Sequence, residues 1–302
     1  MPARVEPVFP APPVHPLPLR CRPSADEDLN GFLLRLAERN LATHPAEILG
    51  HVGVRYPAPY YTEHDLVYLG ALAGISRRRL AAMQPRVQNL TSWDAPATWH
   101  SVELRLADLS WEPRRICPAC IGLSPHQRWW WTIEALGGCP EHGRMFLTRC
   151  PSCRRRLSHE RSPIAVCPCG TKYSEVETPA MEPEMAFASR YIVDRLRRQQ
   201  HAYGGSFDRI PLFHAIRTAS QLGSRLLGRI DHAPSRLGPS QAAVFACGFV
   251  THLARCEDLS RTVQLIVLMH SAHLPFGDVP PEVSRRSSPA CSLSRSSSQP
   301  KK

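Results

Sequence analysis

Four close pairs of cysteine and histidine residues between positions 117 and 169 constrain this chain more than any other feature. The pairs are Cys117-Pro-Ala-Cys120, Cys139-Pro-Glu-His142, Cys150-Pro-Ser-Cys153 and Cys167-Pro-Cys169. Thiolate and imidazole are the ligands that zinc prefers, and structural zinc sites use four of them. Two ligands from one tight turn can bind the same ion. The spacing therefore predicts two structural zinc ions, Zn²⁺, in this segment.

The short connection between the second and third pairs favours a sequential grouping of the ligands. The first site then uses Cys117, Cys120, Cys139 and His142, and the second uses Cys150, Cys153, Cys167 and Cys169. An interleaved grouping stays open. Four protein ligands leave no position for water, so we expect structural rather than catalytic ions. Such ions contribute about 10–16 kcal/mol in small zinc modules, enough to fold a segment with little core.

Other uses of these cysteines fit the sequence less well. The chain has 11 cysteines, an odd number, and its first residues contain no apolar segment of a secretory signal, which argues against a disulfide framework. His142 argues against an iron–sulfur cluster, and no βαβ pattern supports a thioredoxin-like pair. The nearby His126 and His159 are interpreted as surface residues or as supports outside the ligand sets.

Apolar runs are too short to cross a membrane. The longest, Ala242–Val250, is interrupted by Gly248, whereas a membrane-spanning helix needs about 20 apolar residues. We therefore expect a soluble, cytoplasmic protein with no membrane contact.

Capping residues predict several short helices in the N-terminal part. Ser24-Ala-Asp-Glu27 has the spacing of a capping box that opens a helix with one apolar face. Further helices are expected over Pro45–Leu49, from Thr62 to Gly74 and over Arg77–Met83.

The last two of these helices are joined by a tight turn at Gly74, which is the pattern of a helix-turn-helix. The second helix begins with Arg77, Arg78 and Arg79, so these residues are candidate DNA contacts. The alternative is a helical packing module with a solvated basic face.

The whole pattern predicts a mainly α-helical fold with small zinc-binding modules. Residues 86–116 are expected to form short strands or loops. Further helices are expected over Met185–Gln199, Leu212–Ile230, Gln241–Cys256 and Leu259–His270. The expected organisation is a flexible Pro-rich leader (1–18), a helical, helix-turn-helix-like region (19–110), tandem zinc fingers (111–178), a C-terminal helical region (179–283) and a disordered tail (284–302).

The positive charge of the chain favours a polyanionic partner. The formal net charge is +11, and nearly all of the basic residues are arginine, a skew that a GC-rich genome also produces. Arg154, Arg155 and Arg156 follow the Cys150/Cys153 pair, and such a patch suits contact with DNA phosphates. A solvated face or an acidic protein partner are the alternatives.

Two further features bear on function. Trp129-Trp130-Trp131 could stack on bases, but a tryptophan run in a small zinc module more often fills its core, and we favour the core. No Gly-rich phosphate loop, nucleophile elbow or metalloprotease helix is present, and the acidic residues do not cluster as magnesium chemistry requires. We expect no enzymatic activity.

With these motifs in place, the chain resembles the TniQ family of transposition proteins, which is related to the TnsD target selectors. Residues Pro23–Ala37 are similar to the amino-terminal signature of the family, with Asp28 in place of the usual Ser and Phe32 in place of the usual Trp. Residues Ile116–Gly170 are similar to its cysteine region, with every ligand position occupied.

The resemblance implies a non-enzymatic accessory protein that acts in target-site selection. Its expected partners are DNA, an AAA+ ATPase regulator and a DDE-type transposase, and a homodimer stays open. A zinc-dependent transcription regulator and a nucleic-acid enzyme are the competing hypotheses.

Overall fold

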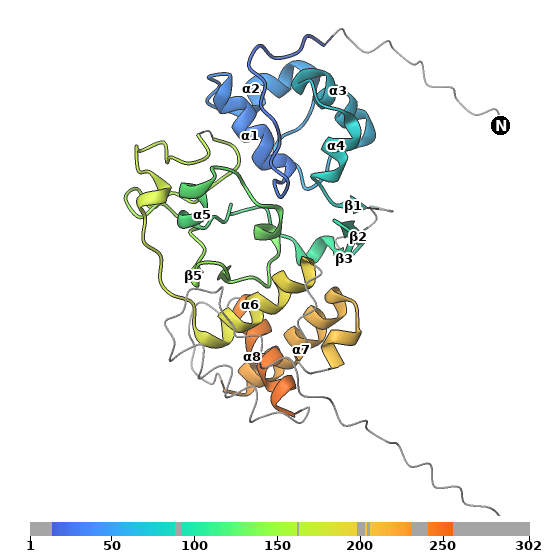
Figure 1. Ribbon diagram of the computed structural model, residues 1–302, viewed down its shortest axis with the longest axis vertical. Helices are drawn as coiled ribbons and strands as arrows, with labels where there is room; N and C mark the ends of the chain where they lie inside the picture. Colours follow the sequence, from blue (N-terminus) through green and yellow to red (C-terminus); the bar gives the residue numbers. More distant parts are fainter. Residues whose placement is uncertain are drawn as a thin grey trace, which may run out of the picture.

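Three regions follow one another along the long axis of the molecule (Figure 1). N-terminal helices form one end, the cysteine region lies in the middle, and C-terminal helices form the other end. The structure is a computed structural model that describes residues 14–87, 92, 94–161, 163–197, 203, 206–230 and 241–255. Within these residues, helices predominate over two small antiparallel sheets, which confirms the mainly helical class. The predicted helix Leu259–His270 and the predicted tail lie outside them.

The N-terminal helices pack around a core of their own. They are α1 (Leu29–Arg39), α2 (Pro45–Leu49), α3 (Glu63–Ala73) and α4 (Arg77–Ala82). Their apolar faces meet in one buried cluster that includes Phe32, Leu33, Leu69 and Leu80. Burial of large side chains of this kind stabilises a fold by about 1.5–3 kcal/mol each, so these short helices depend on one another.

The sequence signals for the ends of α3 are confirmed. The Thr62 hydroxyl accepts a hydrogen bond from the Asp65 backbone N–H at 3.1 Å, and the Asp65 carboxylate accepts one from the Thr62 N–H at 2.8 Å. Gly74 ends the helix in the left-handed conformation with φ of 66°, which glycine adopts without a Cβ penalty. The α3–α4 helix pair therefore has the expected short turn.

The predicted capping box at the start of α1 is wrong. Asp28 is the N-cap, and its carboxylate accepts a hydrogen bond from the Gly31 N–H. Glu27 instead forms a two-pronged ion pair with Arg35, at 2.9 and 2.6 Å. The fully buried Glu27 carboxylate also accepts a hydrogen bond from the Ser24 N–H at 2.9 Å, which is one half of the predicted box, but this bond closes a turn before the helix rather than capping it.

Residues 14–18, which the sequence places in the flexible leader, lie against the N-terminal helices. Val14 and Leu17 are half-buried against the apolar cluster, and the Leu17 N–H donates to the Leu72 carbonyl at 2.9 Å. Their apolar side chains explain why this end of the leader packs.

A three-stranded antiparallel sheet follows α4. Its strands are β1 (Arg86–Val87), β2 (Pro96–Trp99) and β3 (Val102–Arg105), in that order. His100 and Ser101 connect β2 to β3 with φ of 48° and 65°, the backbone of a tight hairpin turn. Trp99 and Leu104 are buried in the core of the cysteine region, so these strands pack with that region rather than with the N-terminal helices.

The C-terminal helices share a single core with the cysteine region. They are α6 (Pro183–Leu196), α7 (Leu212–Ile230) and α8 (Gln241–Arg255), each close to its predicted range. Helices α7 and α8 touch at Gly223 and Gly248, where an added Cβ would lie 1.8 Å from a carbonyl oxygen of the other helix. No helix of the described residues is long and apolar enough to span a membrane.

Two short backbone segments are among the contacts that join the N-terminal helices to the cysteine region. The Asp28 N–H donates to the Gln127 carbonyl at 3.0 Å, and the Trp129 N–H donates to the Asp26 carbonyl at 2.9 Å. The Asp26 carboxylate adds contacts to His126 at 2.6 Å and to Arg128 at 2.9 Å. The chain entering α1 is therefore fixed directly to residues that precede the tryptophan run.

The two aspartates at this joint have opposite electrostatic environments. Burial raises the pKa of Asp28 to about 6, because it outweighs the neighbouring His159 and the bond from Gly31. For Asp26, burial also acts to raise the pKa, but the bonds to His126 and Arg128 outweigh it and lower the pKa to about 2. Ionised Asp28 is therefore unfavourable in the folded chain, whereas ionised Asp26 is favourable.

These environments predict opposite effects of D28N and D26N on stability. Between about pH 4 and pH 6 the folded chain keeps a proton at Asp28 that the unfolded chain has lost, so stability falls as pH rises. D28N keeps an oxygen for the cap and removes the charge. It should raise the free energy of unfolding at pH 7.5 by about 2 kcal/mol, with the gain shrinking toward pH 5.

D26N is the matched control at the same joint. It removes favourable charge contacts from a partly exposed side chain, so we expect a loss of about 1 kcal/mol at pH 7.5. Urea unfolding of both variants at pH 5 and pH 7.5 measures the effects. A D28N protein that is less stable than the wild type at pH 7.5 would contradict this account of the joint.

Candidate metal centres

The first Cys/His cluster combines ligands from a helix and a hairpin. Cys117 is the N-cap of α5 (Pro118–Leu123), and Cys120 lies one turn further along that helix. Cys139 ends β4 (Gly138–Cys139), and His142 lies in the turn before β5 (Arg144–Met145). The turn closes with a hydrogen bond from the Gly143 N–H to the Cys139 carbonyl at 2.9 Å. Two local turns thus present two ligands each.

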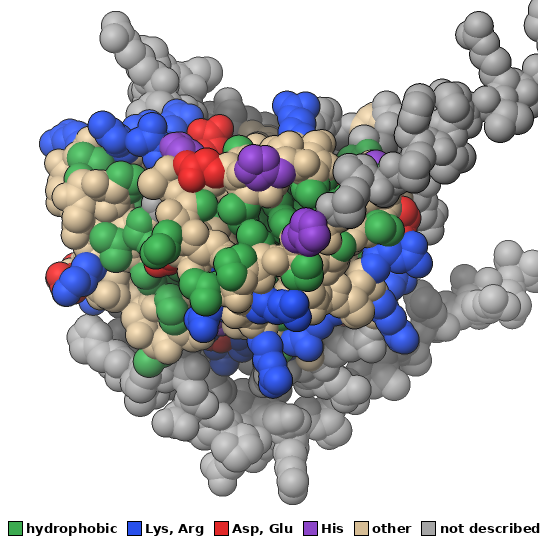
Figure 2. Space-filling model, turned by 90° about the horizontal axis from the view of Figure 1, so that it is seen from above, with side chains coloured by type: hydrophobic (Ala, Val, Ile, Leu, Met, Phe, Trp, Pro, Cys, Tyr) green, Lys and Arg blue, Asp and Glu red, His purple; other side chains and the backbone are tan. Residues whose placement is uncertain are grey.

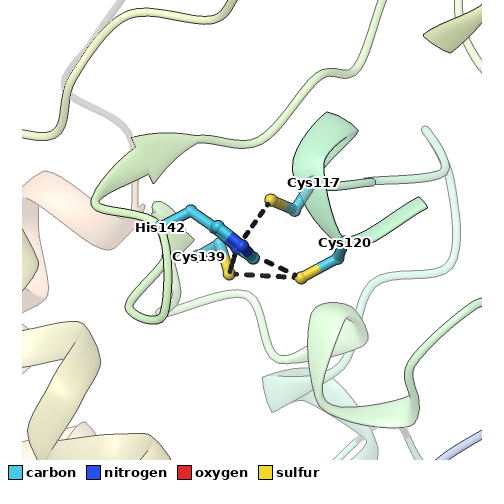
Figure 3. A group of neighbouring side chains, drawn as sticks. All are labelled: Cys117, Cys120, Cys139 and His142. Carbon is cyan, nitrogen blue, oxygen red and sulfur yellow. Dashed lines mark hydrogen bonds between the residues drawn. The ribbon is translucent and has the colours of Figure 1, made fainter. Parts of the chain in front are cut away.

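The ligand atoms of this cluster lie at the separations of a tetrahedral site (Figure 3). The Cys120 and Cys139 sulfurs are 3.7 Å apart, and the His142 Nδ1 lies 3.4–3.5 Å from all three sulfurs. Zn–S bonds of about 2.3 Å place tetrahedral sulfurs about 3.8 Å apart. The donors therefore fit zinc, with histidine binding through Nδ1.

The thiols of this cluster compete for protons. Hydrogen bonds from Cys120 and Cys139 lower the pKa of Cys117. The bond to Cys117 raises the pKa of both Cys120 and Cys139. Without a cation, one thiolate therefore keeps its neighbours protonated. A metal ion supplies the positive charge that three thiolates in one place require.

The second cluster has the same dimensions and a more exposed position. Its sulfur pairs Cys150/Cys169 and Cys153/Cys167 are each 3.6 Å apart. Cys150 and Cys167 are buried, whereas Cys169 is exposed and lies 3.2 Å from the Thr171 hydroxyl. Backbone bonds from Arg154 to Cys150 and from Gly170 to Cys167 close the two turns.

The structure resolves the grouping that the sequence left open. The ligand atoms of each sequential set all lie within 4.8 Å of one another, so the interleaved arrangement is not formed. All eight cysteine and histidine ligands predicted from the sequence are brought together in these two clusters. The cysteines are free thiols, because their sulfurs are far beyond the about 2.05 Å of a disulfide. Both clusters could hold a metal ion.

The two nearby histidines are not surface residues, which corrects one of the interpretations above. His126 is 5% exposed and bonds Asp26, and His159 is fully buried and bonds Glu112 at 3.3 Å. Neither belongs to a ligand cluster. Each connects the cysteine region to a carboxylate far away in the sequence, which residue spacing does not reveal.

The tryptophan run fills the core, as favoured above. Trp129, Trp130 and Trp131 are 6%, 3% and 0% exposed. Trp130 and Trp131 pack with Phe146, and Trp129 packs with Trp99. They are therefore not available to stack on bases in this conformation.

The two arginine runs lie on different sides of the molecule. Helix α4, which begins at Arg77, and the second cluster lie at opposite sides of Figure 1. Arg77 pairs with Glu63 at 3.1 Å, and Arg79 donates to the Pro23 carbonyl at 3.1 Å. In the end-on view, Lys and Arg side chains lie around the edge of the face and apolar side chains occupy its middle (Figure 2). The two runs therefore do not form one continuous basic surface.

The fold and the two clusters define a helical protein with paired four-ligand Cys/His sites. The family model of TniQ matches residues 18–146, so this part of the chain is a TniQ domain and the resemblance is confirmed over these residues. The match covers the N-terminal helices, the three-stranded sheet and the first cluster, and it ends before the second. A comparison with curated proteins gives no match. The chain is thus a transposition-associated protein.

Replacing one ligand in each cluster tests the metal assignment. C139S should lower the metal content of the purified protein by one ion per chain and unfold the cysteine region, because Cys139 is fully buried in its core. C169S, at an exposed ligand, should also release one ion but leave the tryptophan core intact. Elemental analysis with near-UV circular dichroism measures both effects. Unchanged metal content in C139S would refute the ligand assignment.

Proposed function

We propose that this protein is a non-enzymatic accessory protein of DNA transposition that acts in target-site selection. In this role it connects target DNA, or a targeting complex, to an AAA+ ATPase regulator and a DDE-type transposase in the cytoplasm. Two structural Zn²⁺ ions stabilise its middle region. The observation that carries the proposal is the TniQ domain over residues 18–146, with a complete four-ligand cluster inside it.

The arrangement of the regions supports an adaptor role. The cysteine region contacts the N-terminal helices through backbone hydrogen bonds at Asp28 and Trp129. It also shares one apolar core with the C-terminal helices. A rigid middle that holds two helical ends in fixed positions suits a protein that brings separate partners together. Four protein donors in each cluster leave no open metal position for catalysis.

The second cluster offers the clearest surface for DNA phosphates. Arg154, Arg155 and Arg156 are exposed, and the described residues place no acidic side chain in ion-pair contact with them. The Cys150 N–H donates to the Arg155 carbonyl at 2.9 Å, so the turn that carries a metal ligand also fixes the arginines. Phosphate contact of this kind gives affinity without sequence choice.

Contact of DNA with α4 is a secondary proposal. The α3–α4 pair has the layout of a helix-turn-helix, but α4 is only six residues long, and Arg77 and Arg79 bond other parts of the chain. The Arg77–Glu63 pair is exposed on both sides and therefore contributes little stability. Arg77 can accordingly be released to a phosphate at low cost, and Arg78 and Arg79 follow it on the same helix.

Transposition measured with and without the protein tests the main proposal. The expected result is that insertion frequency falls or that insertion sites become random when the gene is deleted, and that expression of the protein restores them. Normal frequency and site choice in its absence would overturn the proposal. A fixed operator footprint by the protein alone would support a transcription regulator instead, and magnesium-dependent DNA cleavage would support an enzyme.

The triple variant R154A/R155A/R156A tests the phosphate surface. Each lost phosphate contact lowers the slope of log affinity against log salt by about 0.9, so the slope should fall by about two to three. Fluorescence anisotropy with one labelled duplex at several salt concentrations measures it.

The matched control is R217A/R225A, which removes two exposed arginines from α7 at the other end of the molecule. Its salt slope should equal that of the wild type. A triple variant with the wild-type slope would exclude this surface as the site of DNA contact.

A further inference from the structure

Glu141 connects the first cluster to the C-terminal helices. It lies between the ligands Cys139 and His142 in the sequence, so the turn that places these ligands also fixes its backbone. One carboxylate oxygen lies 3.6 Å from the Cys120 sulfur. The other forms a charged hydrogen bond with Arg197, the residue that ends α6. A single side chain thus touches a metal ligand and the far end of a helix.

The same hairpin also holds the start of α6. The Met181 N–H donates to the Gly143 carbonyl at 2.9 Å, and the Met145 N–H donates to the Pro179 carbonyl at 2.8 Å. Residues just before α6 therefore run beside the ligand-bearing turn, and Arg197 at its other end returns to that turn. Both ends of α6 depend on the position of residues 139–145.

The negative charge of an occupied first site explains why the Glu141 carboxylate pairs with Arg197. A filled cage of three thiolates and one histidine around a divalent ion keeps a net negative charge. A carboxylate beside it is unfavourable unless a cation offsets the charge, and Arg197 provides that cation at direct contact. Arg128 lies on the side of the N-terminal helices and bonds Asp26 instead.

Among the described residues, no carboxylate joins a ligand of the second cluster to the C-terminal helices. The hydroxyl beside Cys169 belongs to Thr171, which donates to the Ser152 hydroxyl at 2.8 Å, within the same module. The nearby acidic residue Glu175 pairs with Lys172, three positions away, and both side chains are exposed. The two clusters therefore differ, among the described residues, in whether a carboxylate beside a ligand pairs with the end of α6.

We propose that Glu141 is a positioning residue that fastens the C-terminal helices to the first metal centre. The turn that presents His142 to the ion presents Glu141 to Arg197, so an occupied first site fixes the end of α6. The second site stabilises its own module, in which the His159 carbonyl accepts from the Tyr56 hydroxyl and the Ile164 N–H donates to the Glu38 carboxylate of α1. This inference depends on the proposed binding of metal by the first cluster.

Hydrogen exchange of the full, metal-loaded chain tests the proposal. E141Q and R197M should each increase exchange of the last amides of α6 by about threefold to tenfold, and the double variant should exchange no faster than either. Both ions should remain bound in elemental analysis. E175Q, which breaks the ion pair beside the second cluster, is the matched control and should leave α6 unchanged.

The ligand variants give a second measurement. Exchange of α6 should increase in C139S and stay at the wild-type rate in C169S. If C139S unfolds more of the chain than α6, the exchange of α6 measured in E141Q tests the proposal instead. Wild-type exchange of α6 in E141Q, or loss of the first ion from E141Q, would overturn the role of Glu141. Wild-type protein with no metal in the first site would instead refute the underlying metal assignment, so the two failures are distinguishable.

Discussion

Four ligand atoms converge beside the apolar core of the middle region, where they could hold one metal ion. Cys117, Cys120 and Cys139 are fully buried, and their sulfurs lie within bonding reach of one ion together with His142. Buried thiols of this kind add little by apolar contact and repel one another when ionised. A cation bound between them offsets this repulsion, so that bringing the thiolates together stabilises the folded state strongly. The cysteine region in turn supports both helical ends, so the consequences of that one interaction reach the whole molecule.

Features set by local sequence could be predicted well. One or two residues separate the ligands of each pair within a single turn, so their spacing alone identifies them. The Thr62 cap and the Gly74 end of α3 are likewise decided within a few residues. The periodicity of the C-terminal helices also identified α6, α7 and α8 close to their observed ranges. In each case the physical cause and the residues that show it are neighbours in the chain.

Features set by distant partners could not be predicted. Glu27 has the spacing of a capping residue, but its carboxylate pairs with Arg35 and the cap is Asp28. His126 meets Asp26 across 100 residues, and a lone histidine near zinc ligands has no pattern that reveals such a partner. The role of Glu141 could not be predicted either, because its neighbours Cys139 and His142 account for the motif without it. Charged side chains in particular acquire their roles only when the chain has folded.

The residues that carry the family resemblance have mainly structural roles in this chain. Glu27 is buried in an ion pair, Phe32 is buried in the N-terminal core, and the tryptophan run is buried beside the first cluster. They fix the joint between the N-terminal helices and the cysteine region, and they leave no side chain of their own for a partner. Exposed positions that the family pattern does not specify, such as Arg154–Arg156 of the proposed phosphate surface, stay accessible to a partner. A TniQ domain can therefore keep the same buried framework while its exposed residues determine what the protein binds.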